Sequence, residues 1–244
     1  MKKILFFLYL ILLPFINIAQ NNRIYYYNGT ISLNGNYVNI NSGAQSILNA
    51  SVLHNVTTKL KNDSEFDFTT NINYNNIIKN NSTILSNDII FRINPRIIHK
   101  KWSIFNYEQV SSLYSRKIDL RIESAIGGGI YWLNTDLIQG TIAYSTIVST
   151  THYNNDIVIN AIRHSPRVQL FFKYKNINSS IEMYYQPMIS DNNNYNYNYT
   201  AKLSVPVNKS LSINLMDIMT YESFTIAGTS NSNSNLSLGI TYHY

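Results

Sequence analysis

The stretch Leu236-Ser-Leu-Gly-Ile-Thr-Tyr-His-Tyr244 places a large apolar side chain at every second position. Successive side chains of a β-strand point to opposite faces, so this alternation predicts a strand with one apolar face and one polar face. The apolar face comprises Leu236, Leu238, Ile240, Tyr242 and Tyr244. Aromatic side chains stand at the end of that face, which indicates a boundary between apolar and aqueous surroundings.

The N-terminal segment has the order of a secretory signal peptide. Lys2 and Lys3 precede an apolar run from Ile4 to Leu13, and a short tail to Ala19 follows. This order predicts export and cleavage, so we expect residues 1–20 to be a signal peptide and residues 21–244 to be the mature domain. A retained anchor is the alternative, but the apolar run is shorter than the roughly 20 residues that span a bilayer as a helix.

Composition restricts how this chain can enter a membrane. The sequence has 20 Tyr, 10 Phe and 13% charged residues, and its mean hydropathy is −0.14. There is no Cys, which excludes a lipidated N-terminal Cys and a disulfide framework. No stretch after the signal segment is long and apolar enough for a membrane helix, so membrane insertion requires a β-barrel, whose alternating strands give an average hydropathy near neutral.

The net charge argues against nucleic acid as a partner. The formal charge is +6, and removal of Lys2 and Lys3 leaves about +4. A modest basic excess suits acidic lipid headgroups and sugars. The chain has no dense cluster of Lys and Arg interleaved with aromatic residues, so no nucleic-acid interaction is expected.

Alternation with a period of two recurs along the mature chain and predicts about twelve strands, separated by Asn, Ser, Asp, Gly and Pro. Each segment is long enough for the roughly 9 to 11 residues of a tilted membrane strand. A count of ten strands with longer loops stays open. The predicted spans are 30–41, 45–57, 64–75, 83–93, 102–113, 118–132, 137–149, 158–174, 180–189, 195–205, 210–222 and 234–244.

The segment from Ile118 to Trp132 has the clearest alternation. Leu120 and Ile122 share the apolar face with Ile118, whereas Arg121 and Glu123 lie on the other face. One face suits lipid and the other suits a wet lumen. Two segments are less regular. Asp217 shares a face with apolar residues, which predicts a bulge near Met216 or an early end to the lipid-facing part, and residues 102–113 carry aromatic side chains on both faces.

Connection lengths predict the orientation, because bacterial barrels keep periplasmic turns short and place longer loops outside. With a periplasmic N-terminus, short inner turns are expected at 133–136, 175–179 and 206–208, and outward loops at 150–157, 190–194 and 223–233.

The order of these features resembles a family of Gram-negative outer-membrane β-barrels of unknown function, described as salt-induced outer-membrane proteins. The resemblance covers most of the mature chain. Its motifs are Gly35-Asn36, Lys100-Lys-Trp-Ser-Ile-Phe105, Asp119-Leu-Arg121 leading to Gly127-Gly-Gly-Ile-Tyr131, Tyr184-Tyr-Gln-Pro187 before Asp191, and Leu238-Gly-Ile-Thr-Tyr242. The C-terminal alternation also resembles the signal by which outer-membrane barrels are recognised for assembly.

The resemblance implies a bacterial outer-membrane location, with outer-membrane lipids and the barrel-assembly machinery as partners. It supplies no established reaction, no cofactor and no catalytic residues.

Charged residues on the polar faces are the candidate functional residues of the lumen. Opposite charges there can pair across strands and fill a small barrel, or they can line a narrow polar conduit whose selectivity they set. The candidates are Glu108, Arg121, Glu123, Arg167, Lys173, Glu182 and Lys202.

No motif in the sequence predicts an enzyme. The five His residues lack metal-ligand spacing, and Gly127–Gly129 lacks the Lys-Ser/Thr of a phosphate-binding loop. No cofactor or metal is therefore expected. Two alternatives stay open: an outer-membrane barrel hydrolase using His164-Ser165 or His152 with Asp156, and a secreted soluble β-sandwich that binds sugars.

The prediction from the sequence is thus an all-β, antiparallel transmembrane β-barrel of about twelve strands. Its expected role is structural or related to permeability, with a narrow pore for small solutes or ions as one form of that role.

Overall fold

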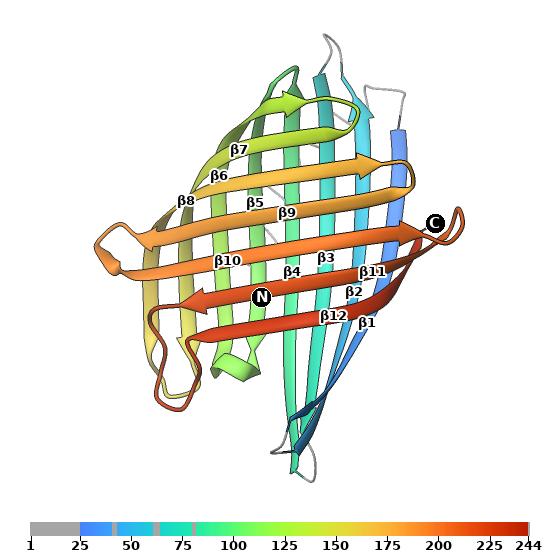
Figure 1. Cartoon of the computed structure of the whole chain (residues 1–244). Helices are drawn as coiled ribbons and strands as arrows, with labels where there is room; N and C mark the ends of the chain where they lie inside the picture. Colours follow the sequence, from blue (N-terminus) through green and yellow to red (C-terminus); the bar gives the residue numbers. More distant parts are fainter. Residues whose placement is uncertain (1–24, 41–42, 61–63, 80–81, 244) are drawn as a thin grey trace.

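The chain folds into a closed antiparallel β-barrel. The computed structural model describes residues 25–40, 43–60, 64–79 and 82–243, and within them every strand pairs with its neighbours in sequence. Figure 1 shows β9 to β12 crossing in front of β2 to β5 at a steep angle. The strands are β1 (Tyr25–Ile40), β2 (Gly43–Lys59), β3 (Ser64–Lys79), β4 (Ser82–His99), β5 (Trp102–Leu113), β6 (Ile118–Asn134), β7 (Ile138–Tyr153), β8 (Val158–Tyr174), β9 (Ile177–Met188), β10 (Asp191–Pro206), β11 (Leu211–Glu222) and β12 (Ser232–His243).

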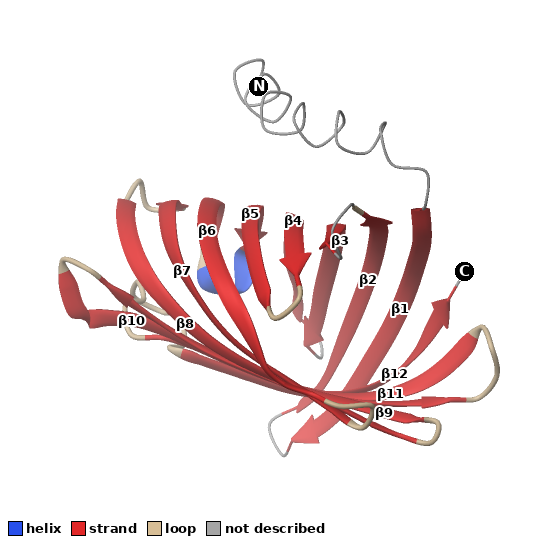
Figure 2. Ribbon diagram, turned by 90° about the horizontal axis from the view of Figure 1, so that it is seen from above, coloured by secondary structure: helices blue, strands red, loops and turns tan. Residues whose placement is uncertain are grey.

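The first and last strands close the sheet. β1 pairs with β12 in a register from Thr30 opposite His243 to Gly35 opposite Leu238, and Figure 2 shows the two strands side by side. This ladder joins the two edges of the sheet over six residues of each strand, and pairing of strand edges is what a sheet in a bilayer requires. The predicted all-β barrel of twelve strands is confirmed. The predicted signal peptide, residues 1–20, and Tyr244 lie outside the described residues.

The barrel has two rims, which differ in their connections. The terminal rim is the end at which β1 begins and β12 ends, and its turns include the two-residue connection Lys100–Lys101. The loop rim is the opposite end. It carries the 3₁₀ turn Tyr114–Arg116 (η1) and the loop 223–231 between β11 and β12. Left-handed backbone at Lys100, Lys117, Asp156 and Lys175 closes four of the tight turns.

The outward face of the barrel is apolar. Leu236, Leu238 and Ile240 are 56%, 61% and 52% exposed, whereas Ser237 and Thr241 on the alternate positions are buried toward the lumen. An exposed apolar surface of this kind suits lipid and not water. The alternative of a soluble β-sandwich, in which the same apolar residues would pack against a second sheet, is therefore wrong. No helix among the described residues has the length and apolarity needed to cross a membrane.

Aromatic side chains lie near both rims on the outward face. Trp102, Trp132, Tyr174 and Tyr242 are exposed near the terminal rim. Near the loop rim, the ring of Tyr195 in β10 lies 5.4 Å from Tyr185 in β9 and 5.6 Å from Tyr221 in β11. This arrangement is typical of the interfacial girdles of membrane barrels.

Three local details differ from the pattern read in the sequence. The ladders of β11 run without a register shift through Asp217, so the predicted bulge near Met216 is wrong and Asp217 faces outward with Leu215. Ile118 is buried inside the barrel, because the register between β6 and β7 shifts between Ile118 and Leu120. In the ambiguous segment, Phe105 and Tyr107 are buried while Trp102 and Ile104 are exposed.

Candidate functional site in the lumen

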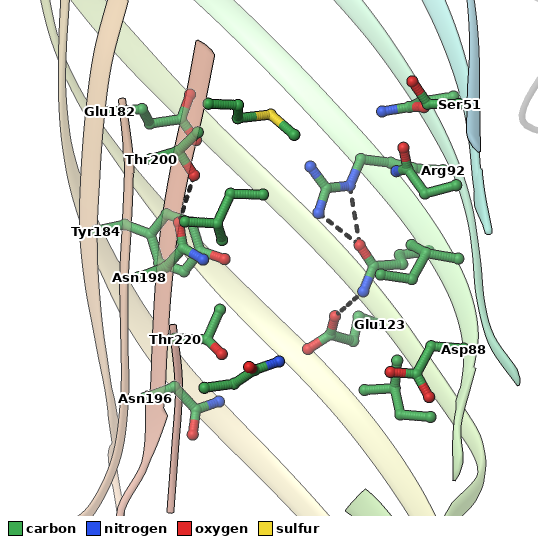
Figure 3. Close-up of a pocket in the computed structure, with 18 of the residues that line it drawn as sticks. Ser51, Asp88, Arg92, Glu123, Glu182, Tyr184, Asn196, Asn198, Thr200 and Thr220 are labelled. Atoms are coloured by element: carbon green, nitrogen blue, oxygen red, sulfur yellow. Dashed lines mark hydrogen bonds between the residues drawn. The ribbon is translucent and has the colours of Figure 1, made fainter. Parts of the chain in front are cut away.

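The inward side chains of the barrel enclose a polar cavity. Its volume is about 510 Å³, and side chains from β2 to β6, from η1 and from β8 to β12 line it. Period-two alternation directs the side chains of the strands inward. Figure 3 shows Glu182, Tyr184 and Asn198 on one wall and Arg92, Glu123 and Asp88 on the other, with open space between them.

A chain of hydrogen bonds joins three strands on one wall of the cavity. Arg92 of β4 donates through Nε and Nη2 to Gln109 Oε1 at 2.9 and 2.6 Å. Gln109 of β5 in turn donates through Nε2 to Glu123 Oε2 of β6 at 2.6 Å, as the dashed lines in Figure 3 show. The guanidinium of Arg92 also lies 5.4 Å from the centre of the Tyr107 ring. These contacts hold a cation and an anion at fixed positions in the lumen.

The opposite wall repeats this combination of Arg, Glu and Tyr. Arg167 of β8 lies 3.9 Å from Glu182 of β9, and Gln169 Nε2 donates to Glu182 at 3.1 Å. The guanidinium of Arg167 is 5.5 Å from the centre of the Tyr184 ring. Tyr107, Tyr184 and Arg167 line the same cavity. The two walls therefore form a narrow polar zone midway along the barrel.

A second polar cluster lies at the loop rim. Arg121 of β6 makes a bidentate contact with Glu222 of β11, with N–O distances of 2.9 and 3.1 Å. Arg116 of η1 reaches the same carboxylate at 2.9 Å and also donates to Thr220. The three charged side chains are only 11–13% exposed. This cluster connects opposite sides of the barrel, because β6 and β11 are not neighbours in the sheet.

Arg163 of β8 extends the loop-rim cluster. It is 7% exposed, and it donates to the carbonyl of Gln186 and to both the carbonyl and the side-chain oxygen of Asn194. Among the described residues, the hydrogen-bond acceptors of Arg163 are neutral oxygen atoms and not carboxylates. This arginine therefore adds positive charge to the loop rim.

The loop 223–231 crosses the mouth of the barrel at the loop rim. Ile226 is 7% exposed and packs against Ile118 of β6 and Tyr153 of β7, two inward side chains of the far wall. Lys117 Nζ donates to the Ala227 carbonyl at 2.8 Å. The Phe224 ring also packs edge-on against Tyr153. The lumen is consequently narrowed at this end.

The structure brings five of the seven predicted lumen charges together at the cavity: Arg121, Glu123, Arg167, Glu182 and Lys202. Lys173 is on the inward face of β8 but lies exposed near its end. The prediction for Glu108 is wrong. This residue faces outward and accepts a hydrogen bond from Ser124 Oγ at 2.8 Å. The inward face of β5 carries Phe105, Tyr107 and Gln109. Aromatic residues occur on both faces of this strand, so its sequence did not indicate which face is inward.

Five charged residues were missed by the sequence reasoning: Asp88, Arg92, Arg116, Arg163 and Glu222. Alternation contained a signal for Arg92, since Ile89, Phe91 and Ile93 occupy the other face of its strand. Arg116 lies in a turn and Glu222 ends a strand, where period two carries no information. Their roles depend on contacts between segments about 100 residues apart in sequence.

The histidines do not assemble the predicted hydrolytic pairs. His164 contacts the Tyr144 hydroxyl on the outward face, whereas Ser165 is buried inside the barrel. His152 faces outward on β7, and no contact joins it to Asp156 among the described residues. At the terminal rim Ser64 Oγ lies 2.8 Å from His99 Nδ1, a pair the sequence did not reveal, but no described carboxylate orients this ring. The described residues contain no group of His, Asp and Glu suited to a metal ion.

Comparisons with known proteins identify the fold. No protein-family model matches the sequence, and no curated protein matches it. Among solved structures, the NanC porin aligns with a TM-score of 0.53 at 10% identity, over 87% of this chain and 98% of that one. An outer-membrane channel from Pseudomonas putida F1 aligns with a TM-score of 0.56 at 5% identity, over 89% of this chain and 94% of that one. The chain has the fold of an outer-membrane β-barrel. The barrel character that the sequence resemblance implied is thereby confirmed, while membership of the salt-induced family stays a prediction.

Proposed function

We propose that this outer-membrane β-barrel is a narrow, water-filled channel for small polar solutes or ions. The observation that carries the proposal is the cavity of about 510 Å³, which is lined by Arg, Glu, Asn, Thr and Tyr side chains from ten of the twelve strands. Polar and charged groups lining a lumen replace part of the hydration of a passing solute and set its selectivity. This role requires no reaction and no cofactor.

The channel is exported through the N-terminal signal segment and inserted into the bacterial outer membrane by the barrel-assembly machinery. The loop rim faces the exterior and the terminal rim faces the periplasm. Support for this orientation comes from loop length, because the long loop 223–231 lies at the loop rim while the terminal rim has turns such as Lys100–Lys101.

A sealed barrel that supports the envelope is the second candidate. The observation that favours it is the packing of Ile226 against Ile118 and Tyr153, together with the Arg116–Glu222–Arg121 cluster. In the channel proposal these same contacts narrow the outer mouth without closing it. The two candidates differ in whether the purified protein conducts ions.

Planar-bilayer recording of the purified, reconstituted mature chain tests the proposal. We expect small single-channel currents from the wild type and larger ones from Ile226→Asp, because a carboxylate cannot stay in the apolar contact that holds the loop. Ala227→Asp is the matched control, since this neighbouring side chain is exposed and its charge leaves the contact intact. Folded wild-type barrel that gives no channel events would contradict the channel and favour the sealed barrel.

A further inference from the structure

The charges of the lumen are distributed unevenly along its axis. Midway along the barrel, Arg92 and Arg167 are matched by Glu123 and Glu182, so this zone is neutral. Among the described inward side chains at the loop rim, three arginines are accompanied by two carboxylates: Glu222, which contacts Arg116 and Arg121, and Asp88, which accepts from Ser115. The surplus there is one positive charge, held in a compact network of hydrogen bonds.

Lys202 is the cavity-lining cation that has no partner among the described residues. It projects from the inward face of β10, between Ser180 of β9 and Met216 of β11. Among the described residues, no hydrogen bond or ion pair involves its ammonium group. Glu182 lies diagonally across from it, but Arg167 and Gln169 already contact that carboxylate. Lys202 therefore presents an uncompensated charge to the half of the cavity nearer the terminal rim.

Asn214 of β11 lies beside Lys202 on the same inward face. Its Nδ2 donates to Thr241 Oγ1 at 2.5 Å, while its Oδ1 is buried with no hydrogen-bond partner among the described residues. The side chains directly across from Lys202, Ser180 and Met216, are uncharged, and the diagonal Glu182 is already engaged by Arg167 and Gln169. A buried polar group that lacks a partner is uncommon and points to water or a solute at that position.

The turns and strand ends of the terminal rim add further positive charge in front of Lys202. Five described lysines at this rim have no acidic residue directly across the ladder: Lys100, Lys101, Lys173, Lys175 and Lys209. The described acidic residue in the same turns is Asp136. By contrast, Lys59 lies across from Glu65 and Arg96 lies across from Asp67. A mouth ringed by one sign of charge concentrates the opposite ion near its entrance.

We propose that the lumen is selective for small anions and that Lys202 is the residue that contacts the passing anion. The basic terminal rim raises the local anion concentration, and Lys202 then offers the uncompensated ammonium group inside the channel. This inference rests on the proposed channel function and specifies its substrate class. The neutral zone of paired arginines and glutamates beyond Lys202 opposes neither sign of ion strongly.

Reversal potentials in a KCl gradient test this inference with the reconstituted mature chain. We expect the wild type to favour chloride over potassium, and Lys202→Gln to lower the permeability ratio by about fivefold, which is the effect of one unit charge near contact in water. Lys202→Glu lowers the ratio further, and Lys202→Arg retains it. Lys59→Gln is the matched control, because Lys59 lies across from Glu65 and is outside the set of unmatched rim lysines. It removes one charge at the exposed terminal rim, where salt screening within about 10 Å weakens its effect on the lumen.

The outcomes separate this inference from the channel function. Channel events with a preference for potassium, or a permeability ratio that Lys202→Gln leaves unchanged, would overturn the anion inference while the channel stands. Absence of channel events in all variants would overturn the channel, and the anion inference would fall with it.

Discussion

Glu222 illustrates how single residues hold the lumen together. Its carboxylate accepts two hydrogen bonds from Arg121 and forms an ion pair with Arg116, and all three side chains are largely shielded from solvent. Removing three charged groups from water carries a desolvation penalty. The bidentate, charge-assisted hydrogen bonds of this cluster offset that penalty. The cluster fixes the positions of η1, β6 and β11 relative to one another, because it links them across the mouth at the loop rim.

Glu108 is the opposite case, a carboxylate on the outward, lipid-facing wall. Ser124 donates to it, but its strand neighbour across the ladder in β4 is Ile93. We expect Glu108→Leu to raise the free energy of unfolding by about 1 kcal/mol, since an acidic residue on the lipid face is destabilising. Denaturant titration of the barrel in liposomes measures this change.

The matched control for Glu108 is Gln109→Leu, one position along the same strand. Gln109 faces inward and bridges Arg92 and Glu123, so its loss should lower stability. A clear loss of stability in Glu108→Leu would contradict the prediction and mean that the hydrogen bond from Ser124 outweighs the cost of a carboxylate on the lipid face.

At the scale of the element, β6 shows why the strands tolerate little change at close contacts. Gly127 lies opposite Phe105 of β5 and Ser145 of β7. A Cβ atom at this position would come within 2.5 Å of the Tyr144 carbonyl oxygen and 2.7 Å of Phe105 Cζ. The glycine thus makes room for the Phe105 ring inside the barrel.

Gly127→Ala should therefore destabilise the barrel by about 1–3 kcal/mol through overpacking. Gly128→Ala is the control, because Gly128 faces outward and its Cβ would lie 3.3 Å from the Ser103 carbonyl oxygen. Thermal unfolding followed by the gel mobility of the folded and unfolded forms compares the two. Equal stability of the two variants would contradict the close packing of Phe105 on Gly127.

At the scale of the whole molecule, closure makes the last strand a part of the barrel wall. β12 pairs with both β1 and β11, and its alternate residues face lipid and lumen. A single polar change on the outward side therefore exposes charge to the bilayer, whereas a change on the inward side meets water.

We expect Ile240→Asp to impair assembly in the outer membrane, since Ile240 is 52% exposed on the outward face of β12. Asn233→Asp is the control, because Asn233 lines the cavity on the same strand. Membrane fractionation with a heat-modifiability assay measures the assembled fraction. Normal assembly of Ile240→Asp would mean that this face of β12 does not contact lipid.

Alternation by itself determined the strands, the closed-barrel class, the outward position of residues such as Leu238 and the inward position of Arg121, Glu123 and Lys202. These properties are local, because a strand directs neighbouring side chains to opposite faces wherever it lies. Only the tertiary structure decided that Glu108 faces outward, that Glu222 holds Arg121, and that Ile226 narrows the mouth at the loop rim. Aromatic residues on both faces of β5 made its local pattern ambiguous, and contacts across the lumen depend on barrel closure and register, which bring together segments about 100 residues apart.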